Sequence, residues 1–118
     1  MNPPQKFDQM LIEAIDEGLN SLGESTKNHL YIILKDDFSI TKDVIPQQIE
    51  EFSKLLIRIF GLSAYQLEIQ FMKRLYSKIS STQQTELRSI DLSSKEMTLS
   101  KYVQKMRESF EITNPSNF

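Results

Sequence analysis

The segment from Phe7 to Gly23 constrains the fold of this chain more than any other. Its apolar residues recur at helical spacing and would form one face of a single helix. This face consists of Phe7, Leu11, Ala14, Ile15, Gly18 and Leu22. Gly18 lies in the middle of this face, where glycine gives up roughly 1 kcal/mol of helix propensity relative to alanine. We therefore expect another backbone to pack very close to Gly18. Gly23 follows the last apolar residue, where a left-handed residue would end the helix.

The composition excludes several classes of site. The chain has 118 residues, enough for one domain with its own core, and it contains no cysteine and a single histidine, His29. A cysteine nucleophile and a histidine-based metal cluster are therefore excluded. The three glycines are too scattered for a phosphate loop, and the acidic loop 36–43 lacks the spacing of a calcium site. We expect no catalytic residue, no cofactor and no metal ion.

Hydropathy gives no indication of a membrane. Residues 1–6 lack the apolar core of a signal peptide, and no apolar run approaches the roughly 20 residues of a membrane span. We expect a cytoplasmic protein without a membrane partner.

Apolar periodicity predicts an all-α fold, a four-helix bundle with an additional C-terminal amphipathic helix. The bundle helices are expected over 6–22, from 24 to a connector at 36–43, from Pro46 to a stop at Gly61, and from Ser63 to about 79. The second should bury Leu30, Ile33, Leu34 and Phe38, and the third Ile49, Phe52, Leu55, Leu56, Ile59 and Phe60. Residues 81–94 form a Ser/Thr-rich linker between a helical domain at 1–80 and a C-terminal helix and frayed tail at 95–118.

Glu68 is the one charged residue that helical projection places within an apolar face. A buried carboxylate is costly unless it is paired or hydrogen-bonded. We expect a structural contact with a lysine, an arginine, a tyrosine hydroxyl or a helix N-terminus. A place at a subunit interface or in a ligand groove is the alternative. Catalysis by paired carboxylates would need a second convergent acid, which the sequence does not identify.

The chain has more apolar surface than a lone four-helix unit needs. Ile32 projects away from the apolar stripe of the second helix, and Ile69 and Tyr76 lie at the far edge of the apolar stripe of the fourth. The last helix adds a narrow stripe that consists of Leu99, Tyr102, Val103, Met106 and Phe110. Self-association, giving a homodimer or another homo-oligomer, or docking of the last helix would use this surface.

A set of motifs extends over residues 7–79. They are Ala14-Ile15-Asp16-Glu17-Gly18-Leu19, Leu22-Gly23-Glu24-Ser25, Ile45-Pro46, Phe52, Ile59-Phe60-Gly61, Ala64, Leu67-Glu68 and Leu75-Tyr76. In these motifs the chain resembles an archaeal family of small helical modules, the fifth Nitrosopumilus output domain. The resemblance implies an all-helical module with an output or interaction role in signalling, and it brings no catalytic residues.

These observations together predict a non-enzymatic protein-interaction or signalling-output module whose partner is a second copy or a signalling protein. One alternative is a nucleic-acid-binding transcriptional regulator with a helix-turn-helix-like pair, although a net charge of −2 does not favour phosphate contacts. Another is a small-ligand-binding bundle, or an enzyme, with its cavity around Glu68 and Tyr76.

Overall fold

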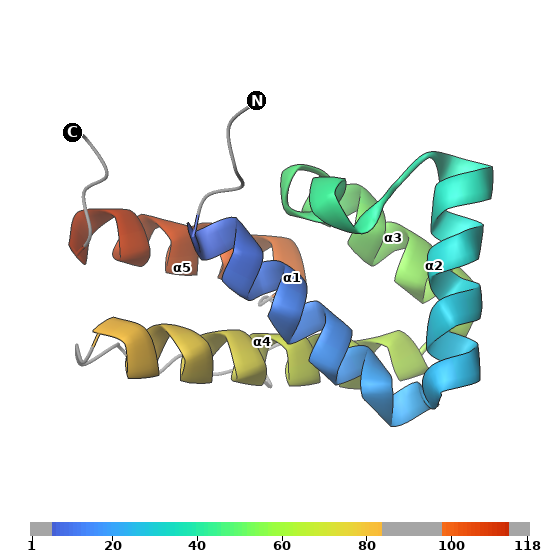
Figure 1. Ribbon diagram of the computed structural model, residues 1–118, viewed down its shortest axis with the longest axis horizontal. Coiled ribbons are helices and arrows are strands. Elements are labelled where there is room, and N and C mark those ends of the chain that lie inside the picture. The colour runs from blue at the N-terminus through green and yellow to red at the C-terminus, as the bar shows by residue number, and fades with distance from the viewer. Residues whose placement is uncertain (1–5, 84–97, 114–118) are drawn as a thin grey trace.

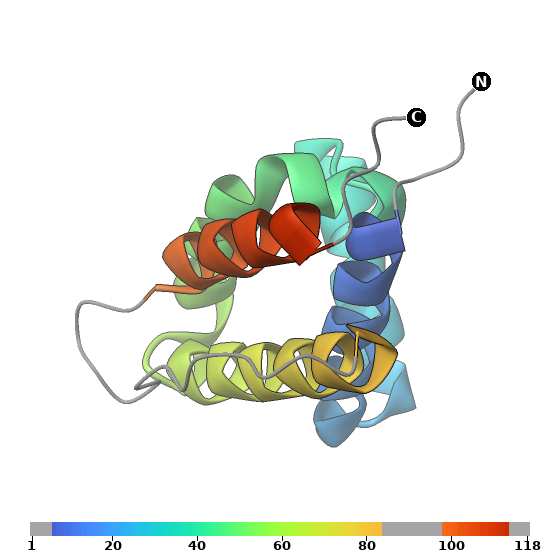
Figure 2. The same cartoon turned by 90° about the vertical axis from the view of Figure 1, so that its left-hand side faces the viewer.

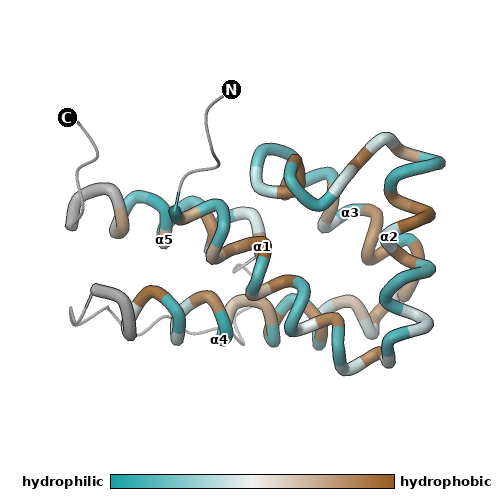
Figure 3. Tube along the Cα trace, viewed as in Figure 1, coloured by the Kyte–Doolittle hydropathy of each residue, from teal (hydrophilic) through white to brown (hydrophobic). Residues whose placement is uncertain are grey.

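The structure is a computed structural model that describes residues 6–83 and 98–113. In chain order its elements are α1 (Lys6–Leu19), the 3-10 helix η1 (Asn20–Leu22), α2 (Glu24–Phe38), the 3-10 helix η2 (Lys42–Gln48), α3 (Ile49–Phe60), α4 (Ser63–Gln83) and α5 (Leu99–Thr113). Every element of the described ranges is helical, so the all-α prediction is confirmed (Figure 1). Apolar and polar residues interchange along each helix, as amphipathic packing requires (Figure 3).

The helix boundaries depart from the predictions at several places. Helix α2 runs to Phe38 and so extends into the predicted connector 36–43. The first helix ends at Leu19, and the chain continues as a 3-10 turn before Gly23. Gly23 has φ 90° and ψ 153°, so it ends the segment in an extended, positive-φ conformation and not in the predicted left-handed helical one. Pro46 lies inside η2, because the chain forms a 3-10 helix there and α3 begins only at Ile49. The fourth helix runs to Gln83, three residues beyond the predicted domain boundary, and residues 84–94 of the predicted linker lie outside the described ranges.

Helices α1 and α4 cross at Gly18 and form the most extensive helix pair of the structure. A Cβ atom at Gly18 would lie 2.5 Å from Cδ1 of Phe71, whose side chain is fully buried. The ring of Phe71 is the nearest group to the glycine, and the Cβ of Gln70, also in α4, would lie 3.7 Å from the added atom. Helix α4 therefore packs close to Gly18, with an aromatic side chain as the nearest contact.

Helix α5 belongs to the core. It packs against α4 and α3, and its buried stripe consists of Leu99, Tyr102, Val103 and Met106, each at most 2% exposed. Figure 2 shows how α1, α4 and α5 are arranged around one centre. Among the described residues, no helix combines the length and hydropathy that a membrane span requires.

Helix α2 lies at the edge of the molecule (Figure 1). It buries only Leu30 and Leu34, while Phe38, expected on its inner face, is 40% exposed. Ile59 of α3 was also expected to be buried and is 40% exposed, because α2 covers that end of α3 incompletely. The two helices therefore leave apolar side chains accessible where they meet.

Candidate functional site

Two carboxylates are buried within the described ranges, and both contact α5. Asp8 of α1 and Glu68 of α4 are each 4% exposed. Glu68 lies at the first residue of α5, whereas Asp8 lies beside Arg107, eight residues further along that helix. At 1.5 Å per residue the two contacts are about 12 Å apart along the α5 axis. The carboxylates therefore anchor different parts of one helix and do not converge on a common point.

Glu68 accepts hydrogen bonds from α3 and from the N-terminus of α5. The Ser53 hydroxyl donates to Oε2 at 2.6 Å, and the backbone N–H of Leu99 donates to the same carboxyl. Burial raises the pKa of the Glu68 carboxyl, and these two hydrogen bonds oppose the increase only in part. A carboxylate at this position satisfies an N–H that the helix itself leaves unpaired and interacts favourably with the helix dipole.

Asp8 holds α5 near the middle of the helix. Arg107 Nη1 lies 2.7 Å from Oδ1 of Asp8, and Gln47 of η2 donates to Oδ2 at 3.0 Å. The arginine contact is an ion pair by distance, although its angle leaves Oδ1 without a well-aligned hydrogen bond within the described part of the chain. The guanidinium carbon also lies 4.6 Å from the centre of the Phe7 ring, which in turn packs against Phe110 at 5.8 Å.

The burial of Asp8 was not predicted, although its spacing from apolar residues of the first helix indicated it. Asp8 precedes Leu11 by three residues and Ile15 by seven, so it shares their face of α1. An acidic residue in the first turn of a helix is usually attributed to the helix dipole and placed in solvent. The sequence separation of 99 residues between Asp8 and Arg107 concealed the actual partner.

A second polar cluster joins α2 to α1 and η2 at the surface. Asp16 accepts a hydrogen bond from the Tyr31 hydroxyl at 2.9 Å and lies 3.1 Å from Lys42 and 3.4 Å from Lys27. Burial alone would raise the pKa of Asp16, but the hydrogen bond from Tyr31 and the charges of both lysines outweigh it and hold the pKa below its ordinary value. Burial, together with the bond to Asp16, raises the pKa of Tyr31 far above its usual range.

An open groove of about 220 Å³ lies between α2 and the end of α3. Its lining consists of Ser25, Thr26, His29, Leu30, Ile33, Ile59 and Phe60. Leu30 is buried, Ile33 and Phe60 are half-buried, and Ile59 is 40% exposed, so apolar atoms form most of its wall. Pockets that enclose small ligands typically measure about 300–1,000 Å³. This groove is smaller than that and open, which suits one or two apolar side chains of a protein partner.

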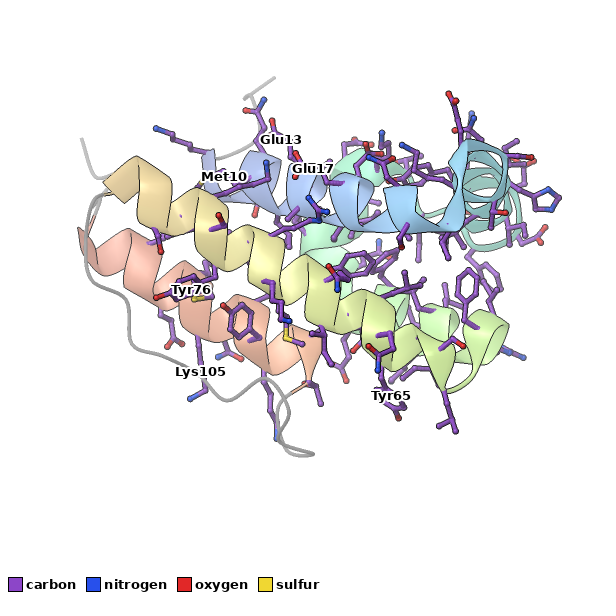
Figure 4. All side chains as sticks on the ribbon, turned by 90° about the horizontal axis from the view of Figure 1, so that it is seen from below. Met10, Glu13, Glu17, Tyr65, Tyr76 and Lys105 are labelled. Carbon is purple, nitrogen blue, oxygen red and sulfur yellow. The ribbon has the colours of Figure 1, made fainter. Side chains whose placement is uncertain are left out.

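The residues predicted to form an interface do not gather on one surface. Leu99, Val103 and Met106 are buried in the core of the same chain, and Ile69, Tyr76 and Phe110 are half-buried against it. Ile32 alone is well exposed, at 57%, and it does not line the groove. Figure 4 shows α5 beside α4, with Glu13 and Glu17 on the α1 side and Lys105 extending away from α4.

The described residues include no group of three or more acidic or histidine side chains placed to hold a metal ion. No family model matches the chain, and no curated protein or solved structure matches it either. The resemblance of residues 7–79 to the archaeal output domain therefore stays a prediction.

Proposed function

We propose that this chain is a non-enzymatic protein-interaction module that receives an apolar side chain of a partner protein in the groove between α2 and α3. The observation that carries the proposal is the groove itself, whose apolar wall on α2 and α3 stays accessible. Interfaces are commonly organised around such a pocket, which takes one buried anchor residue and is surrounded by polar groups. Ser25, Thr26 and His29 supply polar groups at the α2 side of the groove.

The positions of the buried acids support a non-enzymatic role. Glu68 accepts hydrogen bonds from Ser53 and from the N-terminus of α5, and Asp8 is paired with Arg107 and Gln47. General acid–base catalysis would need a carboxyl within hydrogen-bond reach of a bound substrate. Neither acid lines the groove.

The charge on α2 favours a protein partner over nucleic acid. The helix carries Glu24, Asp36 and Asp37 against Lys27 and Lys35, and Lys27 is already paired with Asp16. A helix that approaches phosphates needs local positive charge. We extend the proposal to a signalling-output role in an archaeal cytoplasm on the resemblance of residues 7–79.

Selection from a displayed library of helical peptides tests the groove directly. We expect the selected peptides to share a large apolar anchor and to shift the NMR resonances of Ile33, Ile59 and Phe60. Ile59→Glu should weaken their binding by at least tenfold, because it places a charge in an apolar wall. Ile57→Glu is the matched control, since Ile57 is 36% exposed on the same helix and lies outside the groove. Peptides that bind both variants equally would contradict the proposed docking surface.

A further inference from the structure

We propose that the partner segment in the α2–α3 groove is a basic amphipathic helix. Its apolar anchor enters the groove, and its lysine or arginine side chains pair with Asp36 and Asp37. This inference rests on the proposed function and names the chemistry of the partner. The two carboxylates belong to the last turn of α2 and are called the acidic end of the groove.

The groove and the acidic end lie on the same face of α2. At 100° per residue, the groove-lining residues of α2 cover an arc of roughly 140° around the helix. They are Ser25, Thr26, His29, Leu30 and Ile33. Asp36 and Asp37, three and four residues after Ile33, fall within this arc. The remaining Lys, Asp and Glu residues of the helix fall outside it, and they are Glu24, Lys27 and Lys35.

Both carboxylates of the acidic end are accessible to a partner. Each side chain is exposed, and neither makes an ion pair with any residue that the structure describes. Asp16, by contrast, is already paired with Lys27 and Lys42. The negative charge at the acidic end is therefore not neutralised within residues 6–83 and 98–113.

The end of α2 is an unfavourable place for two carboxylates. The C-terminus of a helix carries a partial negative charge, so it favours cations and disfavours anions. Asp36 and Asp37 are also neighbours of like charge, which repel each other. Residues that contradict local preference are expected mainly at functional sites. A cation of the partner would interact favourably with both carboxylates and with the helix dipole.

The geometry of the groove suits a helix as the partner segment. The described elements include no strand to which an extended peptide could add, whereas an amphipathic helix can lay its apolar face into a groove. Along the α2 axis, the acidic end lies about 5–6 Å beyond Ile33 and about 15–17 Å beyond Thr26. A helix laid along α2 has the same rise per residue. Cations one to three turns from its anchor would therefore reach the acidic end.

Parallel selections test the charge preference of the groove. The displayed library of helical peptides is selected against the wild type and against the double variant Asp36→Lys, Asp37→Lys. We expect the wild type to enrich peptides with a large apolar anchor and with lysine or arginine one to three turns to one side of it. The double variant should keep the preference for the anchor and lose the preference for basic residues, because its charge is reversed while the groove is unchanged.

A synthetic copy of the most enriched peptide measures the size of the effect. We expect Asp37→Lys to weaken its binding by about fivefold at low salt, and added salt to reduce this difference, since exposed charges are screened. Glu24→Lys is the matched control, because it changes the charge of the same helix by the same amount on another face. Glu24 lies about 20 Å from Asp37 along the axis, so its reversal should change the affinity by less than about twofold.

The melting temperature of the free protein gives a second readout. Lysines suit the C-terminal end of a helix, so the double variant should melt a few degrees above the wild type while it binds the peptide more weakly. Acids with a purely structural role would not give these opposite changes. Equal effects of Asp37→Lys and Glu24→Lys on binding would overturn the inference.

The selections distinguish a failure of this inference from a failure of the proposed function. Wild-type peptides that share an anchor but show no excess of basic residues, or an excess of acidic ones, would overturn the inference and leave the proposed function intact. Peptides without a common anchor would contradict the proposed function and the inference with it.

Discussion

Helices α2 and α5 are both 15 residues long and are attached to the molecule in different ways. Helix α2 buries two residues and is joined to α1 by the hydrogen bond of Tyr31 and the ion pair of Lys27 with Asp16, which are partly exposed. Among the α5 side chains that the structure describes, four are buried, and the helix is joined by two carboxylates that are almost inaccessible to water. The helix that follows α1 directly in sequence is therefore peripheral, and the one at the far end of the chain completes the core. The difference locates stability at α5 and accessible apolar surface at α2.

The largest expected effect compares a core side chain of α5 with a surface side chain of α2. Tyr102 is 1% exposed, so Tyr102→Ala should lower the free energy of unfolding by about 3–5 kcal/mol, the range for losing a large aromatic side chain from a core. Ile32 is 57% exposed, and Ile32→Ala should change stability by less than about 0.5 kcal/mol. Urea denaturation measures both. Similar decreases in the free energy of unfolding for the two variants would contradict the view that α5 contributes more to stability than α2.

The sequence was sufficient to predict where most helices lie. Gly61 and Ser63 mark the end of α3 and the start of α4 as expected, because a positive φ of 64° suits glycine and because two residues suffice for the turn. Periodicity also identified the buried stripe of α5. It does not specify which surface covers a stripe, and so it left open whether α5 packs on its own chain.

The candidate sites depended on contacts between distant residues. The expectation that Ile59 is buried treated α3 as fully covered, whereas α2 leaves one side of it open to form the groove. Asp8 looked like a solvated acid of the first helical turn, and only the folded chain brings Arg107 to it. Whether a polar side chain is buried depends on how the helices pack, and the spacing of residues along the sequence does not determine that packing.

The anchor at the start of α5 should show a pH dependence of its own. The pKa of Glu68 is raised above its ordinary 4.5, so the stability it contributes is full below that value and is lost as pH rises through the raised pKa. The advantage of the wild type over Glu68→Gln should therefore shrink as pH increases from 4.5. At neutral pH the difference should be about 1 kcal/mol, since loss of a charged hydrogen bond is offset by relief of desolvation. An advantage that grows with pH would contradict the burial of this acid.

A smaller effect than at Glu68 is expected at Asp16, with a pH dependence of opposite sign. Its pKa is lowered below the ordinary 3.8, so its contribution is present above that value and is lost as pH falls through the lowered pKa. Asp16→Asn should cost less than about 1 kcal/mol at neutral pH, because the pairs with Lys27 and Lys42 are partly exposed to solvent. Salt should reduce this cost further, whereas it should leave the Glu68→Gln difference nearly unchanged, since buried groups are screened much less. Thermal melts at low and high ionic strength would measure both. If added salt changed the stability differences of Asp16→Asn and Glu68→Gln equally, the polar contacts of α2 and α5 would be equally exposed to solvent. The contrast between the two helices would then be wrong.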